Sequence, residues 1–366
     1  MLPVLETLQS YVNMPSGSFD KAEGEKLAQQ LKSDFESLGM AVTLHPGQQF
    51  APTVVCKWGQ GARQLMLMGH YDTVFPKDIS QPFALVDETK ATGLGIVDMK
   101  GGIAIMHHAL KAALPQIDPQ KHAIVCVLNA DEEVGSGESR GHILDNAKQS
   151  FAALSFEPAH EGALTVERKG VTCFELHSSG IGGHAGADYK KGASAIQELM
   201  GKLQQMYALR DDSKDISVNI GVISGGTADN VIANQAYARG EVRSYDPQEM
   251  ERLHQALRDI CAAPGLTGAS TKLIFNASHP PCKQTDQSLA LFEQAKAIGT
   301  SLGLSPWLLS TGGASDIAFA AQANIPVLDG LGMEGGGVHT TQEWLDITKV
   351  EKQLELATRL ILELLG

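Results

Sequence analysis

Four segments of the chain combine an apolar run with side chains of the kinds that bind divalent metal ions. Each run has the length of a buried strand and leads into histidine or carboxylate residues. The four runs lead, in order, to His70, to Asp131-Glu132-Glu133, to Glu157 and, after a glycine-rich loop, to His339. In open α/β sheets, ligands bind beyond the carboxyl ends of the strands. We therefore expect these side chains to converge on one crevice and to form a metal site there.

Each of these motifs alone also fits an ordinary structural role. His70-x-Asp72 fits a surface turn, the acidic run 131–133 fits a solvated turn, and His339 fits a loop histidine. In the functional interpretation, the Asp72 carboxylate accepts a hydrogen bond from the His70 imidazole and fixes its tautomer. An inert role suits Glu157 poorly, because it follows an apolar run and an unpaired buried carboxylate is unfavourable. The convergence of all the motifs favours the metal site.

The segment 93–102, GLGIVDMKGG, contains a partial dinucleotide-binding fingerprint. Asp98 stands where the third glycine of G-x-G-x-x-G belongs, and no early βαβ unit precedes the segment. A nicotinamide-dependent oxidoreductase is therefore disfavoured. Asp98 fits better as a carboxylate on a tight loop before a helix that starts near Ile103.

The elements around these motifs predict an α/β fold. Apolar residues recur at helical spacing over 27–38, and Gly39 stands where such a helix ends. Further helices are expected over 289–302 and at the C-terminus, where Thr348 and Glu351 form a capping box. Strands are expected at 53–57, 65–68, 123–128, 152–156 and 325–328. Strands that alternate with helices are typical of a mixed, mostly parallel sheet flanked by helices.

The pattern of elements changes between residues 170 and 280. The expected order is a strand at 171–176, a helix at 192–206, strands at 216–222 and 235–243, a helix at 247–262 and a strand at 271–275. This βαββαβ order matches the ferredoxin-like split βαβ sandwich. With 366 residues, the chain suits two cores. We therefore predict a discontinuous domain of residues 1–168 and 281–366 and an inserted domain of residues 169–280.

Composition narrows the classes of partner and compartment. The formal net charge is -13, and an acidic protein repels a phosphate backbone, so we expect no nucleic-acid partner. We expect no membrane partner and no signal peptide, because the sequence lacks an apolar run of transmembrane length and a basic N-terminal region before an apolar stretch. The five cysteines are odd in number and form no C-x-x-C pair. A cytoplasmic location is therefore expected.

The metal-binding motifs occur in the order used by a known hydrolase family. They are His70-Tyr-Asp72-Thr-Val, Gly95-Ile-Val-Asp98-Met-Lys-Gly-Gly, Asp131-Glu132-Glu133-x-Gly135-Ser136 and Ser155-Phe-Glu157-Pro. From about Leu8 to the C-terminus, the chain resembles the dinuclear zinc amidohydrolases that include glutamate carboxypeptidase, acetylornithine deacetylase and succinyl-diaminopimelate desuccinylase. It is most similar to the glutamate carboxypeptidase branch. The resemblance implies a zinc-peptidase catalytic domain, an inserted lid and dimerisation domain, and a homodimer.

This resemblance implies ligands for two Zn²⁺ ions. His70 and Glu157 would hold one ion, Glu133 and His339 would hold the other, and Asp98 would bridge both. It also implies a cis peptide bond after Asp98. Histidine nitrogen and carboxylate oxygen suit zinc, and two such ions about 3.5–4 Å apart share and acidify a nucleophilic water. Co²⁺ or Mn²⁺ can substitute for zinc.

The resemblance also implies catalytic and substrate-binding roles. Glu132 would be the general base, and Asp72 would support catalysis by orienting its metal-binding neighbour. His184 would reach into the partner subunit's site and stabilise the oxyanion, and the alternative is an incidental histidine in a glycine-rich surface turn. Asn230 and Arg243 would bind the substrate carboxylate, a task that suits the planar guanidinium, and the alternative is that both are merely exposed.

The remaining positions concern the substrate. Gly312 and Gly313 resemble the family's substrate-side glycine loop, where the absence of side chains lets a substrate approach the backbone. Glutamate-specific relatives place basic side chains in segments that correspond to 159–165 and 278–280, but these segments contain no lysine or arginine, and His279 is largely neutral at pH 7. We therefore expect cleavage of an amide bond next to a free carboxylate, in a small peptide, an N-acyl amino acid or a glutamate conjugate. The alternatives are an N-acyl amino acid deacylase of the acetylornithine deacetylase type and an inactive homologue that binds a peptide or amino acid.

Overall fold

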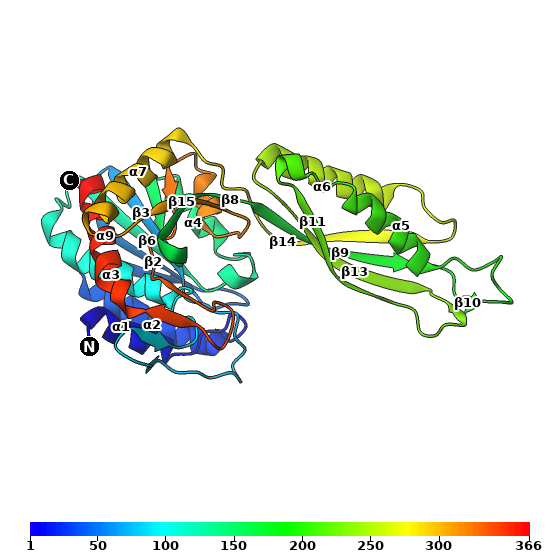
Figure 1. The fold of residues 1–366 in the computed structure, drawn as a ribbon, viewed down its shortest axis with the longest axis horizontal. Helices are drawn as coiled ribbons and strands as arrows, with labels where there is room; N and C mark the ends of the chain where they lie inside the picture. The colour runs from blue at the N-terminus through cyan, green and yellow to red at the C-terminus, as the bar shows by residue number, and fades with distance from the viewer. The chain divides into compact units, whose positions relative to one another are not determined.

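The computed structural model describes residues 1–366, with the side chain of residue 277 excepted. The chain forms two compact units, each with its own hydrophobic core. Unit 1 consists of Met1–Glu167, Gln284–Thr311 and Ser315–Gly366, and unit 2 consists of Arg168–Lys283 and Gly312–Ala314. The colours of Figure 1 show that unit 1 contains both ends of the chain, whereas unit 2 is built mainly from the green and yellow middle segment.

Unit 1 contains a six-stranded sheet in the order β1-β2-β6-β3-β7-β16. Neighbouring strands from β6 to β16 are parallel, and β1 and β2 are added antiparallel at one edge. The strands are β1 (Ala41–His45), β2 (Thr53–Gly59), β3 (Arg63–His70), β6 (His122–Asn129), β7 (Ser150–Ser155) and β16 (Val327–Leu328). The mixed, mostly parallel sheet expected from the sequence is confirmed.

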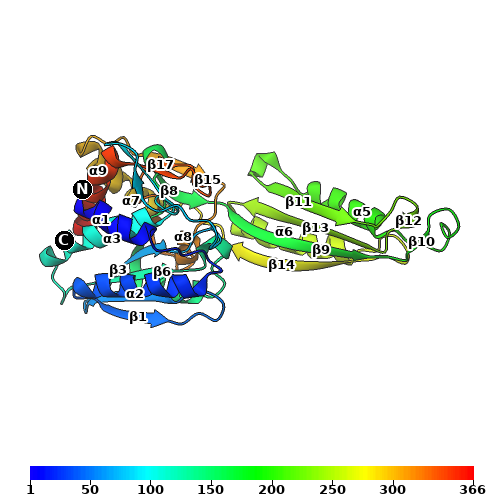
Figure 2. The ribbon, with the colours of Figure 1, turned by 90° about the horizontal axis from the view of Figure 1, so that it is seen from below.

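Helices cover both faces of this sheet (Figures 1 and 2). Leu65 and Leu67 of β3 belong to the core beneath α3, whereas the equally buried Met66 and Met68 alternate with them toward the opposite face. The helices on the α3 side are α1 (Pro3–Val12), α2 (Lys21–Ser37), α3 (Lys100–Ala113), α7 (Asp286–Ser301) and α9 (Ile347–Leu365). The helices α4 (Arg140–Ala147) and α8 (Ile317–Ala321) pack against β6, β7 and β16. Because both faces are covered, the central strands β3 and β6 are near-continuous apolar runs.

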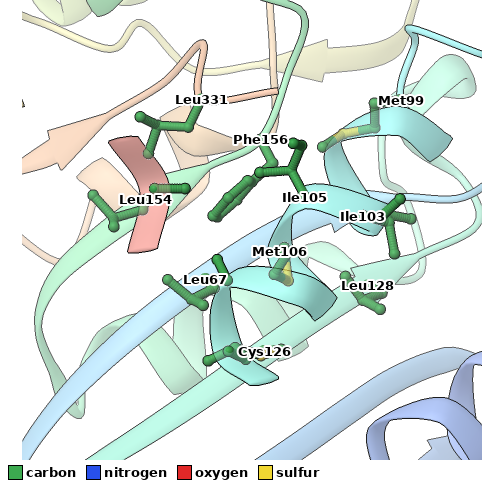
Figure 3. Close-up of a cluster of buried hydrophobic side chains, with 14 of the residues drawn as sticks. Leu67, Met99, Ile103, Ile105, Met106, Cys126, Leu128, Leu154, Phe156 and Leu331 are labelled. Atoms are coloured by element: carbon green, nitrogen blue, oxygen red, sulfur yellow. The ribbon is translucent and has the colours of Figure 1, made fainter. Parts of the chain in front are cut away.

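Helix α3 and the residue before it are anchored deep in the core of unit 1. Figure 3 shows Met99, Ile103 and Met106 above side chains of the sheet, among them Leu67 of β3 and Leu128 of β6. All five side chains are almost completely buried. Burying a side chain of this size stabilises a fold by about 1.5–3 kcal/mol, so this packing fixes the loop that ends at α3.

A glycine near the start of α3 brings two candidate metal ligands together. A Cβ at Gly102 would lie 1.9 Å from the backbone oxygen of Phe156, so only glycine allows this approach. Asp98 lies just before the helix, and Glu157 directly follows Phe156. The close packing of α3 against the end of β7 therefore sets the distance between these two carboxylates.

Short strands that the sequence pattern did not predict position the loop that contains His339. A four-stranded sheet in the order β17-β18-β5-β4 pairs this segment with the one that precedes Asp98. Its strands are β4 (Ala84–Leu85), β5 (Lys90–Thr92), β17 (Gly335–Gly336) and β18 (Trp344–Asp346). A separate pair joins β8 (Ala163–Arg168) and β15 (Trp307–Thr311). Strands of two or three residues are too short to show a period of two in the sequence.

Unit 2 has the βαββαβ order expected from the sequence. Its four long strands form an antiparallel sheet in the order β11-β13-β9-β14, and its two helices share a core with that sheet. The elements are β9 (Gly170–Ser179), α5 (Ala195–Tyr207), β11 (Ser217–Gly225), β13 (Gln235–Ser244), α6 (Pro247–Ala262) and β14 (Ser270–His279). A small pair joins β10 (Gly183–His184) and β12 (Val231–Ile232). Among the described residues, none of the helices has the length and apolar character that a membrane crossing requires.

Two local predictions about helix starts are wrong. Thr348 and Glu351 do not form a capping box, because Asp346 is the N-cap of α9 and its carboxylate accepts hydrogen bonds from the N–H and hydroxyl of Thr348, at 2.9 and 2.5 Å. Helix α3 starts at Lys100 instead of near Ile103. The sequence pattern assigned its first glycines to a loop, although their lack of side chains is what allows the helix to pack closely there.

The packing of α1 against α3 involves a histidine with a perturbed pKa. The Thr7 hydroxyl lies 2.9 Å from His108 Nε2, and the imidazole is half-buried. Burial, followed by the neighbouring His107 and Lys111, lowers the pKa of His108 to about 4. A histidine in an unfolded chain has a pKa of about 6.5. The stability that neutral His108 contributes above that value is therefore lost as the pH falls from about 6.5 toward 4, because the unfolded chain then binds more protons.

We expect His108→Gln to make the protein less sensitive to acid. Glutamine can still bond to the Thr7 hydroxyl but does not titrate. Between about pH 7.5 and about pH 5, the urea midpoint should fall more in the wild type than in the variant. Equal falls in the two proteins would contradict a neutral, burial-perturbed His108.

Candidate metal centre

All five sequence-predicted metal ligands meet in unit 1. His70 ends β3, Asp98 precedes α3, Glu133 lies on the 3₁₀ turn η2 (Glu132–Val134) after β6, Glu157 follows β7, and His339 lies between β17 and β18. Their ligand atoms form two overlapping clusters, His70–Asp98–Glu157 and Asp98–Glu133–His339. Asp98 is the member that the two clusters share.

The distances between these side chains fit a two-metal centre. Asp98 Oδ1 lies 3.2 Å from His70 Nε2, and Asp98 Oδ2 lies 3.2 Å from His339 Nε2. His339 Nε2 is 3.3 Å from Glu133 Oε2, and His70 Nε2 is 3.8 Å from Glu157 Oε2. Ligand atoms that are 2.0–2.2 Å from a tetrahedral zinc ion lie about 3.3–3.6 Å from one another. The donor atoms are therefore spaced to hold one ion in each cluster, with Asp98 as the bridge.

The electrostatics of the centre also favour cations. Burial lowers the pKa of His70, but the carboxylates of Glu157, Asp72 and Asp98 outweigh it and place this pKa well above its usual value. Hydrogen bonds with Asp98 and Glu133 raise the pKa of His339 to about 10. Both imidazoles thus lie beside several carboxylates. A divalent cation neutralises this negative charge more effectively than a proton does.

Asp72 orients one metal ligand and the loop that carries another. Its Oδ1 lies 3.3 Å from His70 Nδ1, so the opposite ring nitrogen faces Asp98. The same carboxylate accepts the backbone N–H groups of Glu132 and Glu133, at 3.3 and 3.2 Å. The peptide bond after Asp98 is cis, as the resemblance implies. Asp72 therefore couples the end of β3 to the turn η2.

Glu132 lies among the metal-binding side chains without belonging to either ligand cluster of the centre. Burial is the main cause that places its pKa well above the usual value, and Glu157, Asp316 and Glu133 add to the shift while His70 opposes it. A carboxyl group with a raised pKa can accept and return a proton near neutral pH. This property suits a general base.

The turn that carries Glu132 and Glu133 is held by a buried polar network. Asp131 Oδ2 accepts the backbone N–H groups of Glu138 and Ser139, at 2.8 and 3.2 Å. The amide of Asn129 donates to Asp316 Oδ2 at 2.6 Å. Sequence reasoning missed the anchoring role of Asn129 and Asp316, because the two residues are 187 positions apart.

Sequence reasoning also missed Glu343, which holds the loop of Asp98, the candidate bridging ligand. Its side chain is 1% exposed and accepts backbone N–H groups from Gly95, Val97 and Asp98, at 2.7, 2.8 and 3.0 Å. Since Glu343 follows His339 by four residues, it ties the loops of two metal ligands together. The only signal in the sequence is a glutamate close to a predicted ligand.

In unit 2, the structure brings His184 and Asn230 close together. The β10–β12 pair aligns His184 with Val231, and the backbone oxygen of Asn230 accepts from Ala185. His184 is exposed, and its Nδ1 accepts the backbone N–H groups of Gly186 and Ala187 at 3.1 and 3.2 Å. In a neutral imidazole the other nitrogen, Nε2, then carries the proton. His184 can therefore donate a hydrogen bond to a developing oxyanion.

The other substrate-binding candidates lie at the opposite end of the ten-residue strand β13, about 30 Å from His184 and Asn230. Arg243 forms a bidentate ion pair with Glu241, at 2.8 and 2.9 Å, and donates to the backbone oxygen of Gly312 at 2.7 Å. Arg168 donates to the backbone oxygen of Gly313 at 3.3 Å. The glycine segment is thus held against the arginine that the resemblance assigns to carboxylate binding, and both Gly312 and Gly313 are exposed.

Replacing Glu343 is expected to weaken metal binding. Glu343→Ala removes three acceptor contacts from the loop of Asp98, and the loss of such a supporting group lowers metal affinity by about 10- to 100-fold. Glu343→Gln should lower the metal affinity less, since its remaining side-chain oxygen can still accept the backbone N–H groups of Val97 and Asp98. Competition between each apo-protein and a chelator for Zn²⁺ measures the affinity, with Glu351→Ala on the exposed side of α9 as control. A wild-type affinity for Glu343→Ala would show that the loop holds its shape without this carboxylate.

The chain is similar to known proteins in sequence and in fold. Residues 66–363 match the family model described as Peptidase family M20/M25/M40. Carboxypeptidase G2 from Pseudomonas sp. (strain RS-16) is 32% identical over 378 residues, which cover 99% of this chain and 89% of that protein. Two solved structures share the fold. Aminopeptidase PepT from Bacillus cereus ATCC 10987 has a TM-score of 0.81 and 22% identity, and the match covers 99% of this chain and 98% of that one. The Bacillus subtilis YXEP protein, described as a dinuclear metal-binding peptidase, has a TM-score of 0.67 and 16% identity, and the match covers 99% of this chain and 97% of that one.

The family model spans most of the chain, and the relative with 32% identity spans nearly all of it. The resemblance stated from the sequence motifs is therefore confirmed. The chain belongs to peptidase family M20/M25/M40 and is a metal-dependent hydrolase of amide bonds.

Proposed function

We propose that this enzyme is a zinc-dependent carboxypeptidase that cleaves the amide bond next to a free carboxylate. The substrate class is a small peptide or an N-acyl amino acid, with glutamate conjugates included. Two Zn²⁺ ions are the proposed cofactors, and Co²⁺ or Mn²⁺ can substitute for them. The relative carboxypeptidase G2, which covers almost the whole chain, supports this choice within the family.

One observation carries the proposal: the two oxygens of Asp98 face different imidazoles, His70 on one side and His339 on the other, each at 3.2 Å. A carboxylate shared in this way would hold two divalent cations. When bound, the two ions supply Lewis-acid polarisation of the scissile carbonyl and of a water molecule beside it.

In unit 1, Glu132 carries out the proton transfers and Asp72 positions a metal ligand. Glu132 takes a proton from water as the water oxygen bonds to the amide carbon, and it returns that proton to the amine nitrogen as the C–N bond breaks. Asp72 keeps the His70 imidazole in the orientation that this geometry requires. The products are a carboxylic acid and a free amine.

We assign three tasks to unit 2 on the resemblance. His184 stabilises the oxyanion with its Nε2–H, Arg243 binds the substrate carboxylate together with Asn230 of the partner subunit, and the segment Gly312-Gly313 lies against the substrate backbone. The bonds from Gly186 and Ala187 to His184 Nδ1 support the first assignment. The exposed position of Asn230 supports the second.

We further propose a homodimer in which His184 serves the partner's site. Apolar side chains are exposed on α5, at Met200 and Tyr207, and on the edge strand β11, at Val222 and Ile223. An exposed edge strand with apolar residues is a ready surface for a second copy of the chain. We also propose a cytoplasmic location, because all five cysteines are free thiols.

Glu132→Ala tests the proposed general base. Loss of a positioned base lowers turnover by about 10²- to 10⁴-fold, while none of the five ligands is removed, so the variant should still bind two metal ions. Turnover is measured on a panel of dipeptides and N-acyl amino acids, together with their C-terminal amides. The amides test the need for a free carboxylate, and Glu251→Ala, an exposed position on α6, is the control. Near-wild-type turnover of Glu132→Ala would exclude Glu132 as the base.

Mixing two inactive variants tests whether His184 acts in the partner's site. We expect His184→Ala to lower turnover by about 10²- to 10³-fold, as the loss of an oxyanion donor does elsewhere. A dimer of one His184→Ala chain and one Glu132→Ala chain then has one complete site, so random pairing should restore about a quarter of wild-type activity. No recovery in dimers that are shown to be mixed would place His184 in its own subunit's site.

A further inference from the structure

A pocket of about 470 Å³ opens beside Glu133 within unit 1. It is lined by three segments, namely 17–20, 73–77 and the pair Glu133-Val134. Small-molecule sites usually have volumes of about 300–1,000 Å³, so the pocket has room for a substantial organic group. Of its lining residues, the reaction described above uses only Glu133.

The wall of this pocket is apolar and partly aromatic. Phe19 is 73% exposed and Val74 is 40% exposed, and Phe75, Pro76 and Val134 complete the apolar lining. A large ring left this open to water, next to a second exposed apolar side chain, is typical of a surface that a ligand covers. The two formal charges of the wall that do not belong to the metal centre, Asp20 and Lys77, have opposite signs. The pocket therefore suits a neutral, apolar group.

The aromatic wall is fixed to the metal centre. Ser18, the neighbour of Phe19, donates its hydroxyl to Asp72 Oδ2 at 2.8 Å and its backbone N–H to Thr73 at 3.1 Å. The chain can approach this closely because the preceding residue is Gly17, where a Cβ would lie 2.1 Å from the backbone oxygen of Phe75. The Phe19 ring also packs against Phe50, with 5.8 Å between ring centroids. The wall is thus preorganised at a set distance from the residue that orients a metal ligand.

We propose that this pocket binds the acyl side of the substrate and selects a large apolar or aromatic acyl group. The proposal rests on the function given above, in which Arg243 and Asn230 of the partner subunit bind the carboxylate of the amine side. The other side of the scissile bond then fills the pocket beside Glu133. An acetyl group would leave most of the pocket empty, whereas an aromatic acyl group would cover Phe19 and Val74.

A series of N-acyl derivatives of a single amino acid tests the proposal. The amino acid is the one cleaved best in the panel above, and the acyl groups are acetyl, butanoyl, benzoyl and phenylacetyl. For the wild type we expect kcat/KM to rise from acetyl to the aromatic groups. Phe19→Ala should lower kcat/KM for the aromatic substrates by about 10-fold, mainly through KM, and leave the acetyl substrate unchanged, because only the large groups reach the ring.

Two further variants separate the pocket from general effects. Leu85→Ala removes another exposed apolar side chain, outside the pocket, and should change no substrate. Val74→Trp fills the pocket and should reduce cleavage of the aromatic substrates while acetyl cleavage remains. A wild type that prefers acetyl, or a Phe19→Ala variant that affects all acyl groups equally, would overturn the pocket assignment and leave the proposed function standing. A metal-loaded wild type that cleaves no substrate of the panel would overturn both.

Discussion

The shared carboxylate of Asp98 is the constraint on which the active-site architecture of unit 1 depends. Its two oxygens reach imidazoles that are carried by distant parts of the chain, His70 and His339, and each cluster adds one more carboxylate. So many carboxylates in a largely buried place are unfavourable unless cations neutralise them, because burial penalises each negative charge. Geometry and electrostatics therefore agree, and divalent ions would stabilise this set of ligands as a group.

Further carboxylates hold the loops of the candidate ligands in place and do not belong to the two ligand clusters themselves. Asp72 and Glu343 each accept backbone N–H groups from a loop that carries metal ligands, and Asp316 is bonded to Asn129 at the end of β6. Backbone N–H groups are strong hydrogen-bond donors, and side-chain rotation does not move them. Anchoring the loops through their backbones therefore leaves the ligand side chains free to face the ions and lowers the reorganisation that metal binding requires.

In the proposed mode of substrate binding, the same anchoring links substrate selection to the chemistry. Ser18 bonds to the Asp72 carboxylate that also orients His70, so the aromatic wall of the pocket and the metal ligand share one support. The acyl group and the scissile carbonyl are then positioned by a single rigid assembly. Positioning of this kind contributes to rate, because a reacting bond displaced by even about 1 Å loses much of its advantage.

Patterns within short stretches of sequence were enough for the βαββαβ order of unit 2, the mostly parallel sheet of unit 1 and the segments that contain His70, Glu133, Glu157 and His339, because each segment lies near the end of an apolar strand or in a glycine-rich loop. The ligand role of Asp98 was predicted only from the resemblance to the family. The supporting contacts could not be predicted in this way, because they join residues that are distant in the sequence. Ser18 and Asp72 are 54 residues apart, and Glu343 and Asp98 are 245 residues apart. Asp346 is the N-cap of α9 because β18 ends at this residue. The local pattern of Thr348 and Glu351 does not show where β18 ends. The hydrophobic period and the polarity of the sequence indicate whether a residue is buried and in which element it lies. The partner of a buried polar group depends instead on how the elements pack against one another.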